Sequence, residues 1–303
     1  MVAAGNAYAS DAGLAVLQHG GNAIDAAVAT AFVLGVAEPM MSGAGAGGGL
    51  LYWDARAGRA EYLDFYSASG AVPDTTLRAL GTNVTGRGVG IPGAVRGLLA
   101  AHAWFGKLSR ADVLEPAIRL ASAGITVNAL LAREIASSVD KLSASAGPRA
   151  LFLPAGKPLR AGDHIVQAEL AAALRRIAAD GPDVFYSGEI GDHIVQTLRA
   201  AGSTITTAPT GDCLAMASAP PAAAGIRPAS AGAPGDGSKA ETTHMSVVDA
   251  DGNAVSVTNT LGLAFRTGTW VDGVFLNSAM FNFARDASAP MASIRFRRCA
   301  CRG

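Results

Sequence analysis

A glycine-rich run from Ser42 to Gly49 constrains this chain more than any other stretch, because glycine occupies five of its eight positions. An apolar helix is predicted before it, from Ala23 to about Glu38, and Leu50 to Asp54 after it is typical of a buried strand. Glu61 to Phe65 then predicts a pairing strand beyond a turn at Gly58. A glycine run between a helix and a strand indicates close backbone packing or close approach of a ligand.

The same run contains Gly43, Gly45 and Gly48 at the spacing of the dinucleotide-binding fingerprint. That fingerprint requires a strand before the glycines and a helix after them, because the pyrophosphate binds at the helix N-terminus. Here the predicted order is helix, glycines, strand. A nucleotide-binding domain is therefore kept only as a control hypothesis, for which a titration with NAD or ATP should show no saturation.

The charge balance excludes several classes of partner. Lys plus Arg and Asp plus Glu number 24 each, so no field of one sign exists to attract nucleic acid or an anionic membrane. The longest apolar run, Ala26 to Ala37, is interrupted by Thr30 and Gly35 and is too short to cross a bilayer. We therefore expect no nucleic acid partner and no membrane partner. Met1 to Ala7 lacks a basic segment and a long apolar segment, so no signal peptide is predicted there.

The three cysteines are odd in number and lack the spacing of a metal site. They are Cys213, Cys299 and Cys301, and two of them lie in a basic, irregular tail. We expect no metal ion, no disulfide scaffold and no cofactor.

Further patterns predict a helix-rich first part and a strand pair near the end. Residues 207–239 are rich in Ala, Pro, Gly and Ser, which is typical of a linker or a surface loop. Met245 to Val248 and Ala254 to Thr258 flank the turn sequence Asp249 to Asn253 and predict a β-hairpin. Helices are predicted at Tyr8 to His19, Ala94 to Phe105, Arg110 to Ala123, Ala168 to Ala179 and Glu189 to Ala201.

Thr242 stands where the irregular segment ends and the predicted hairpin begins. If the bond between Glu241 and Thr242 is cut, Thr242 becomes a chain terminus. Its α-amine, with a pKa of about 8, can then accept the proton of its own hydroxyl. The nucleophile and its base lie in one residue, which is a known variant of the catalytic triad. The alternative interpretation is that Thr242 to His244 only starts a strand.

The predicted hairpin gives Thr242 a partner. If the loop has three residues, 250–252, Asp249 pairs with Asn253 and Thr242 falls opposite Thr260 on the same face of the strands. The Thr260 hydroxyl would then stand beside the terminal amine and orient it. A two-residue loop would shift this register by one. His244 shares the face of Thr242 and is expected to be a partly buried structural histidine rather than a base.

These residues belong to an ordered set of motifs that resembles the γ-glutamyltransferase (γ-glutamyltranspeptidase) family of N-terminal-nucleophile hydrolases. The set covers about residues 1–202 and 236–283. It includes Gly20-Gly21-Asn22-Ala23-x-Asp25, Glu38-Pro39-x-x-Ser42-Gly43-x-Gly45, Gly88-Val89-Gly90-Ile91-Pro92-Gly93, Glu115-Pro116-Ala117-Ile118, Phe185-Tyr186-x-Gly188 and Thr242-Thr243-His244-x-Ser246.

The resemblance implies an α+β fold, a four-layer αββα sandwich of N-terminal-nucleophile type, and a precursor cut autocatalytically before Thr242. Residues 1–241 would form a large-subunit-like part, with the irregular linker at about 203–239, and residues 242–303 a truncated small-subunit-like part. Thr242 would attack a small amide or γ-glutamyl compound, as in glutathione metabolism, to give an acyl-enzyme that water or an amine acceptor resolves. Thr260 matches the threonine that supports the nucleophile. Relatives of this type are periplasmic or secreted.

Three matched positions depart from the family pattern. Tyr66 stands where glutamate-binding members have an arginine for the substrate α-carboxylate, and a neutral phenol cannot replace a bidentate guanidinium. Asn282 matches the family carboxylate that holds the substrate α-amine, and Gly262 matches a family asparagine. As substrate-binding positions, these three residues predict a divergent branch that hydrolyses a non-glutamyl amide, as an acylase or an oxamate amidohydrolase does.

The family pattern also contains segments for which this chain offers little counterpart. Residues 202–239 stand in place of a long helical stretch, and residues 285–303 in place of further strands, a lid and the glycine pair of the oxyanion hole. Loss of one oxyanion donor lowers the rate by about a hundredfold to a thousandfold. The sandwich is therefore expected to be incomplete, and a catalytically inactive remnant is the alternative to an active enzyme.

Overall fold

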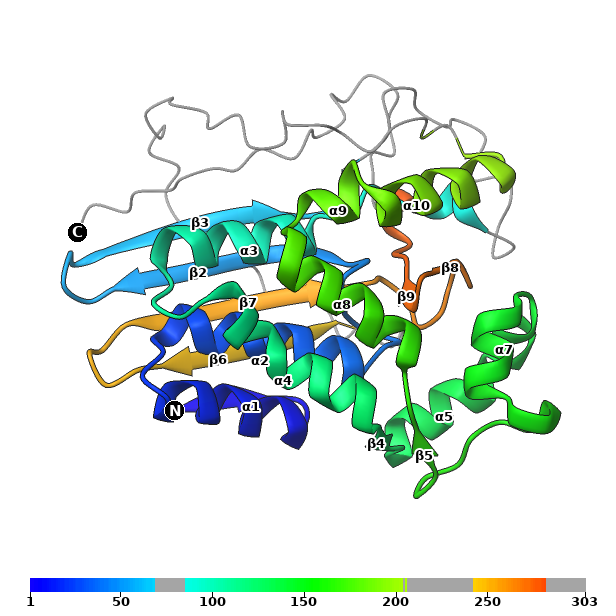
Figure 1. The fold of residues 1–303 in the computed structure, drawn as a ribbon, viewed down its shortest axis with the longest axis horizontal. Helices are drawn as coiled ribbons and strands as arrows, with labels where there is room; N and C mark the ends of the chain where they lie inside the picture. Colours follow the sequence, from blue (N-terminus) through cyan, green and yellow to red (C-terminus); the bar gives the residue numbers. More distant parts are fainter. Residues whose placement is uncertain (69–84, 204, 206–241, 282–303) are drawn as a thin grey trace, which may run out of the picture.

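The computed structural model of this chain describes residues 1–68, 85–203, 205 and 242–281. At its centre lies a five-stranded antiparallel sheet with the strand order β1-β6-β7-β2-β3 (Figure 1). The two late strands β6 and β7 lie between β1 and β2, so early and late parts of the sequence share this sheet. The strands are β1 (Val2–Ala4), β2 (Gly47–Asp54), β3 (Arg59–Phe65), β6 (Thr243–Val248) and β7 (Ala254–Thr260).

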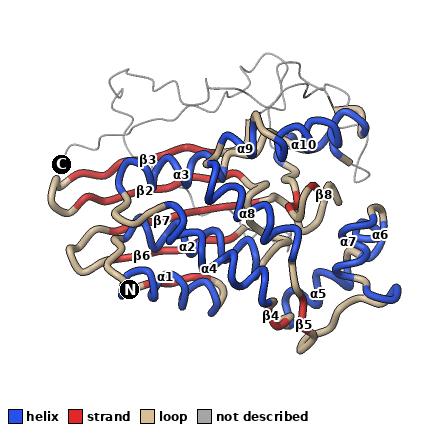
Figure 2. Tube along the Cα trace, viewed as in Figure 1, coloured by secondary structure: helices blue, strands red, loops and turns tan. Residues whose placement is uncertain are grey.

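Helices cover one face of this sheet (Figures 1 and 2). The innermost is α2, which packs against β6 and β7 and is buried along its whole length. Asn22 begins it with a capping box, in which its side chain accepts from the Asp25 N–H while the Asp25 carboxylate accepts from the Asn22 N–H. The covering helices are α1 (Ala7–Gln18), α2 (Ala23–Ala37), α3 (Ala94–Phe105), α4 (Arg110–Ala123) and α8 (Ala168–Asp180).

The two faces of the sheet differ in burial. One register row, Leu63, Leu50, Val257 and Met245, is buried beneath the helices on four neighbouring strands. On the opposite face Leu51, Trp53 and Tyr62 are exposed by 45%, 42% and 38%. The prediction that residues 50–54 form a buried strand is therefore correct on one face only. Period-two alternation places every second side chain away from the helices.

The helix and sheet layers confirm the predicted α+β class. They correspond to an α layer and one β layer of the αββα sandwich, and the described residues contain no second large sheet. The division of the chain at Thr242 stays a prediction, as does the linker at 203–239, most of which lies outside the described residues. Within the described part, residues before and after that division share one sheet.

The predicted bounds of α3 and α4 are confirmed to the residue. The predicted start of the second strand at Leu50 is wrong, since β2 already begins at Gly47. Glycine lets this backbone approach its neighbours, because a Cβ atom on Gly48 would lie 1.9 Å from the Thr258 carbonyl oxygen. Close backbone packing is thus one use of the glycine run. Its order of helix, glycines and strand differs from that of a dinucleotide site.

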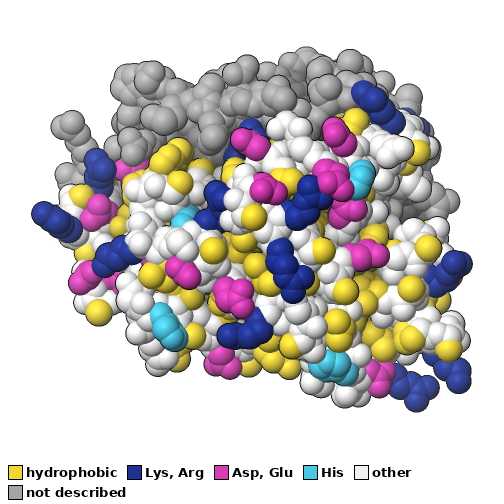
Figure 3. All heavy atoms as spheres, viewed as in Figure 1, with side chains coloured by type: hydrophobic (Ala, Val, Ile, Leu, Met, Phe, Trp, Pro, Cys, Tyr) yellow, Lys and Arg dark blue, Asp and Glu magenta, His cyan; other side chains and the backbone are white. Residues whose placement is uncertain are grey.

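Short elements at one end of the molecule escaped the sequence patterns, because each is too short to show a period. An aromatic cluster joins three of them, in which Trp270 contacts Phe152 and Phe275. No helix in the described ranges is long and apolar enough to cross a bilayer. Acidic and basic side chains intermingle on the face in Figure 3. The missed elements are β4 (Ile125–Thr126), α5 (Ala129–Ser137), α6 (Val139–Ser143), α7 (Ala146–Phe152), β5 (His164–Ile165), α9 (Asp183–Tyr186), β8 (Trp270–Val271) and β9 (Val274–Phe275). By contrast, the predicted helix at Glu189 to Ala201 is confirmed as α10 (Glu189–Ala200).

Candidate active site

Thr242 lies immediately before β6 and is exposed. The hairpin has the predicted three-residue loop, because the Asp249 N–H donates to the Asn253 carbonyl over 3.0 Å. Thr243 pairs with Asn259, so one further step in the register places Thr242 opposite Thr260. The Thr242 hydroxyl donates a hydrogen bond to Thr260 Oγ1 over 3.2 Å. The predicted register and the pairing of the two threonines are therefore confirmed.

Thr260 is itself held by the turn that follows β7. The backbone N–H of Gly262 donates to Thr260 Oγ1 over 2.9 Å. Gly262 has φ +89°, and a Cβ atom there would lie 2.2 Å from Ser278 Oγ. Both the backbone conformation and the close contact favour glycine at this position. In this structure Gly262 orients Thr260, and its predicted substrate contact stays a prediction.

Asn277 connects three segments beside this turn and was missed by the sequence patterns. It is fully buried, and its amide donates to the carbonyl oxygens of Gly45 and Gly90 over 2.8 and 2.9 Å. Its Oδ1 accepts from the N–H groups of Gly90 and Ala279. The adjoining Ser278 N–H donates to the Leu261 carbonyl over 2.8 Å. Asn277 therefore fixes the glycine-rich run against the turn that carries Gly262.

Glu38 is a buried carboxyl that contacts the residue following Thr242. It lies at the C-terminus of α2, is 4% exposed, and accepts from the hydroxyl of Thr243 over 3.1 Å. Burial raises the pKa of Glu38, and hydrogen bonds from Thr243 and Asn6 offset this in part. Since Thr243 directly follows Thr242, Glu38 anchors the backbone of the nucleophile from beneath the sheet.

Tyr66 shares a row with the two threonines across the end of the sheet. Gly47 pairs with Thr260, and Gly48 pairs with Phe65, so Tyr66 follows β3 at the level of Gly47. Three strand spacings separate Tyr66 from Thr242, or about 14 Å. The structure thus places Tyr66 on the same edge as the nucleophile without contact between them. Gly47 is buried against the chain that follows β3, since a Cβ atom there would lie 2.4 Å from the Ser67 backbone nitrogen.

Asn282 and Glu241 lie outside the described residues, as do the three cysteines. His244 is exposed, so the expectation of partial burial is wrong. Its alternation with buried Thr243 turns it to the sheet face that none of the described helices covers. The His244 ring contacts Thr258 Oγ1 at 2.9 Å, which leaves it a neighbour within the strands rather than a base for Thr242. In the described ranges no group of three His, Cys, Asp or Glu side chains is placed to hold a metal ion.

The site thus consists of an exposed threonine that is hydrogen-bonded to a second threonine at one end of a helix-backed antiparallel sheet. The family model "Gamma-glutamyltranspeptidase" matches residues 9–209 and 216–297. The chain belongs to the γ-glutamyltranspeptidase family.

Two curated relatives show the breadth of that family. The glutathione hydrolase proenzyme of Bacillus subtilis (strain 168) is 37% identical over 215 residues, which cover 68% of this chain and 36% of the relative. The acylase ACY 1 proenzyme of Pseudomonas sp. (strain SE83) is 40% identical over 225 residues, which cover 69% of this chain and 40% of the relative. This chain thus spans well under half the length of these two proteins.

Solved structures agree with the fold. γ-Glutamyltranspeptidase from Pseudomonas nitroreducens, complexed with L-DON, is 32% identical with a TM-score of 0.61, covering 67% of this chain and 62% of that one. Cephalosporin acylase from Bacillus halodurans has a TM-score of 0.74 at 21% identity, covering 99% of this chain and 72% of that one. The second likeness concerns the fold alone.

Proposed function

We propose that this chain is an amide hydrolase or acyltransferase that cleaves itself before Thr242 and then uses Thr242 as its nucleophile. The observation that carries the proposal is the hydrogen bond from the Thr242 hydroxyl to Thr260 Oγ1, 3.2 Å long, at the exposed start of β6. The two relatives above are named proenzymes, which supports a self-cleaving precursor.

Self-cleavage begins with attack of Thr242 Oγ1 on the carbonyl carbon of Glu241. The C–N bond to Thr242 breaks, and the acyl group moves to the hydroxyl oxygen as an ester. One water then hydrolyses this ester, leaving a carboxylate on Glu241 and a free α-amine on Thr242. Thr260 would hold the Thr242 hydroxyl in the attacking orientation, because it is itself fixed by the Gly262 N–H.

Turnover uses the terminal amine that self-cleavage has released. This amine takes the proton from Thr242 Oγ1 as the oxygen attacks the substrate amide, and then passes it to the leaving amine. An acyl-enzyme remains, and water or an amine acceptor resolves it by attack at the same carbonyl carbon. The large and small fragments of the chain remain together because they share one sheet.

For the substrate we infer an acyl group that needs no arginine clamp. Tyr66 occupies the edge of the sheet at the level of Gly47 and Thr260, and its phenol can donate one hydrogen bond but carries no positive charge. The 40% identity to an acylase supports this non-glutamyl candidate. The alternative is a γ-glutamyl substrate such as glutathione, which the glutathione hydrolase relative supports.

The intact mass after purification tests self-cleavage. We expect the 30.4 kDa chain to yield two fragments, one beginning at Thr242, and Thr242→Ala to stay intact. Thr242→Ser is the matched variant that keeps a hydroxyl and should still be cut. A wild-type chain that shows no new terminus at Thr242 after long incubation would overturn the proposal.

A second measurement separates an active enzyme from an inactive remnant and ranks the substrates. γ-Glutamyl-p-nitroanilide and butyryl-p-nitroanilide differ in the α-amine and α-carboxylate. We expect release of p-nitroaniline from the butyryl compound, absent in Thr242→Ala. Faster turnover of the γ-glutamyl compound would favour the glutathione hydrolase candidate. Cleaved protein that hydrolyses neither compound would favour the remnant.

A further inference from the structure

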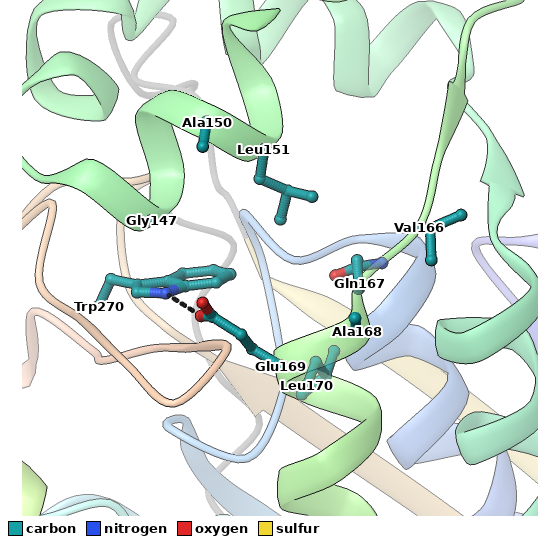
Figure 4. Close-up of a pocket in the computed structure, with 9 residues that line it drawn as sticks. All are labelled: Gly147, Ala150, Leu151, Val166, Gln167, Ala168, Glu169, Leu170 and Trp270. Carbon is teal, nitrogen blue, oxygen red and sulfur yellow. Dashed lines mark hydrogen bonds between the residues drawn. The ribbon is translucent and has the colours of Figure 1, made fainter.

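A cavity of about 240 Å³ lies away from Thr242, between α7, the N-terminus of α8 and β8 (Figure 4). Neither Thr242 nor Thr260 lines it. Its walls are mostly apolar, and its polar side chains are Gln167 and Glu169. From this donor set, we propose that the cavity binds a small organic cation, a primary ammonium carried on a short apolar chain.

Glu169 supplies the charge that such a cation would meet. Its Oε2 accepts a hydrogen bond from Trp270 Nε1 over 3.0 Å, which holds the carboxylate at the cavity. Within the described part of the chain no lysine, arginine or histidine forms an ion pair with Glu169, and the cavity has no cationic side chain in its wall. The carboxylate therefore keeps acceptor capacity for a ligand that donates N–H bonds.

Gln167 is a second, independent sign of a ligand. It is only 2% exposed, its Nε2 donates to the Val36 carbonyl over 2.7 Å, and its Oε1 has no hydrogen-bond partner in the described structure. Figure 4 shows this oxygen turned toward the side of the cavity where Glu169 and Trp270 lie. A buried carbonyl oxygen without a donor is unfavourable, and a ligand ammonium would satisfy it.

Trp270 and its neighbours give the cavity a rigid apolar wall. The indole contacts Phe152 and Phe275 with centroid distances of 6.2 and 4.6 Å, which fixes its orientation. It also lies against Gly147, where a Cβ atom would be 2.6 Å from Trp270 Nε1. An indole face attracts a cation within about 6 Å. Leu151 and Ala150 close the other side, where the apolar chain of the ligand would pack.

The sign of the ligand charge follows from these neighbours. A helix N-terminus alone would favour an anion, but Glu169 in the first turn of α8 already places a carboxylate there. A second anion would meet that carboxylate and the Gln167 carbonyl with no cation to offset them. The size of the cavity suits a ligand of a few carbon atoms, since a water molecule occupies about 30 Å³ in the liquid.

Three probes of equal chain length test the proposal: butylammonium, butanol and butyrate. Isothermal titration calorimetry on the whole chain should show saturable binding of butylammonium in the millimolar range. Butanol should bind about tenfold more weakly, and butyrate should give no saturable heat. Butanol binding as tightly as butylammonium, or no saturable binding of butylammonium, would overturn the proposal.

Glu169→Gln is the decisive variant, because its amide oxygen can still accept from Trp270 while the charge is gone. We expect about a tenfold loss of butylammonium affinity. Glu189→Gln is the matched control, since Glu189 also begins a helix but pairs with Arg176 and does not line the cavity. Equal affinity in wild type and Glu169→Gln would refute the assignment. Circular dichroism confirms that both variants are folded, and Thr242→Ala should bind like the wild type.

Discussion

Asp25 is completely buried in the first turn of α2, where its carboxylate joins that helix to the segment after α3. It accepts from the N–H groups of Asn22 at 2.9 Å, Lys107 at 3.0 Å and Leu108 at 3.3 Å. His102 Nε2 lies 3.3 Å from Asp25 Oδ1. Asp25→Ala would remove the acceptor of three N–H groups at once while leaving them in place.

The expected loss follows from those contacts. An unsatisfied buried N–H is unfavourable by about 1–3 kcal/mol, and Asp25→Ala would leave three of them. The contacts share one carboxylate and are not additive. We therefore expect Asp25→Ala to lower the free energy of unfolding by about 3–5 kcal/mol, out of a total of about 5–15 kcal/mol for a typical domain. Asp112→Ala is the matched control: Asp112 is partnered by Ser109 on the surface, and we expect less than about 1 kcal/mol there.

The pKa of Asp25 determines how this stabilisation changes with pH. Burial alone would raise the pKa of Asp25, but His102 and the three backbone N–H groups outweigh it and hold the pKa below the ordinary 3.8. The unfolded chain therefore binds the proton at a higher pH than the folded chain does. The stabilisation is complete above 3.8 and is lost as the pH falls through the folded pKa.

Urea unfolding followed by circular dichroism measures the difference between wild type and Asp25→Ala. We expect the full difference at pH 7 and a smaller one at about pH 3. A difference below about 1 kcal/mol at pH 7, or one that grows on acidification, would refute the reasoning.

Three further predictions concern other contacts. Thr260→Val should slow self-cleavage by about tenfold or more through loss of the hydroxyl that holds Thr242, whereas the exposed control Thr258→Val should not, as a gel time course would show. Burial raises the pKa of Glu38, so the folded chain binds the carboxyl proton more tightly than the unfolded chain, and the stability contributed by Glu38 falls as the pH rises above the ordinary 4.5. Glu38→Gln should therefore flatten the fall of the unfolding free energy with pH, measured by urea unfolding between about pH 4 and 7. An unchanged slope would contradict this prediction. Asp272→Asn should return the raised pKa of His193 toward 6.5, because the hydrogen bond and charge of Asp272 cause the shift; an unmoved NMR titration curve would disprove this.

Local sequence patterns predicted the bounds of two helices and the register of the hairpin to the residue. The bounds of α3 and α4 follow from their apolar spacing, and the three-residue loop at 250–252 sets the pairing of Thr242 with Thr260. Both depend on contacts within about twenty residues along the chain. The ordered motifs likewise identified the family before any tertiary contact was known.

Long-range contacts decided the surroundings of the nucleophile. Glu38 reaches Thr243 across 205 sequence positions, and Asn277 reaches Gly45 across 232, so no period or spacing could reveal either contact. The same holds for Gln167 and Trp270, which meet at one cavity only because α8 and β8 pack together.

The sequence by itself therefore determined the hairpin that follows Thr242, and with a three-residue loop it predicted Thr242 opposite Thr260, since hairpin register is a local property of the loop. Only the tertiary structure decided what stands beneath and beside Thr242: a buried carboxyl, a turn fixed by an asparagine, and a sheet face that no described helix covers. Those neighbours come together because burial of α2 and the central strands is a property of the whole chain, not of any one segment.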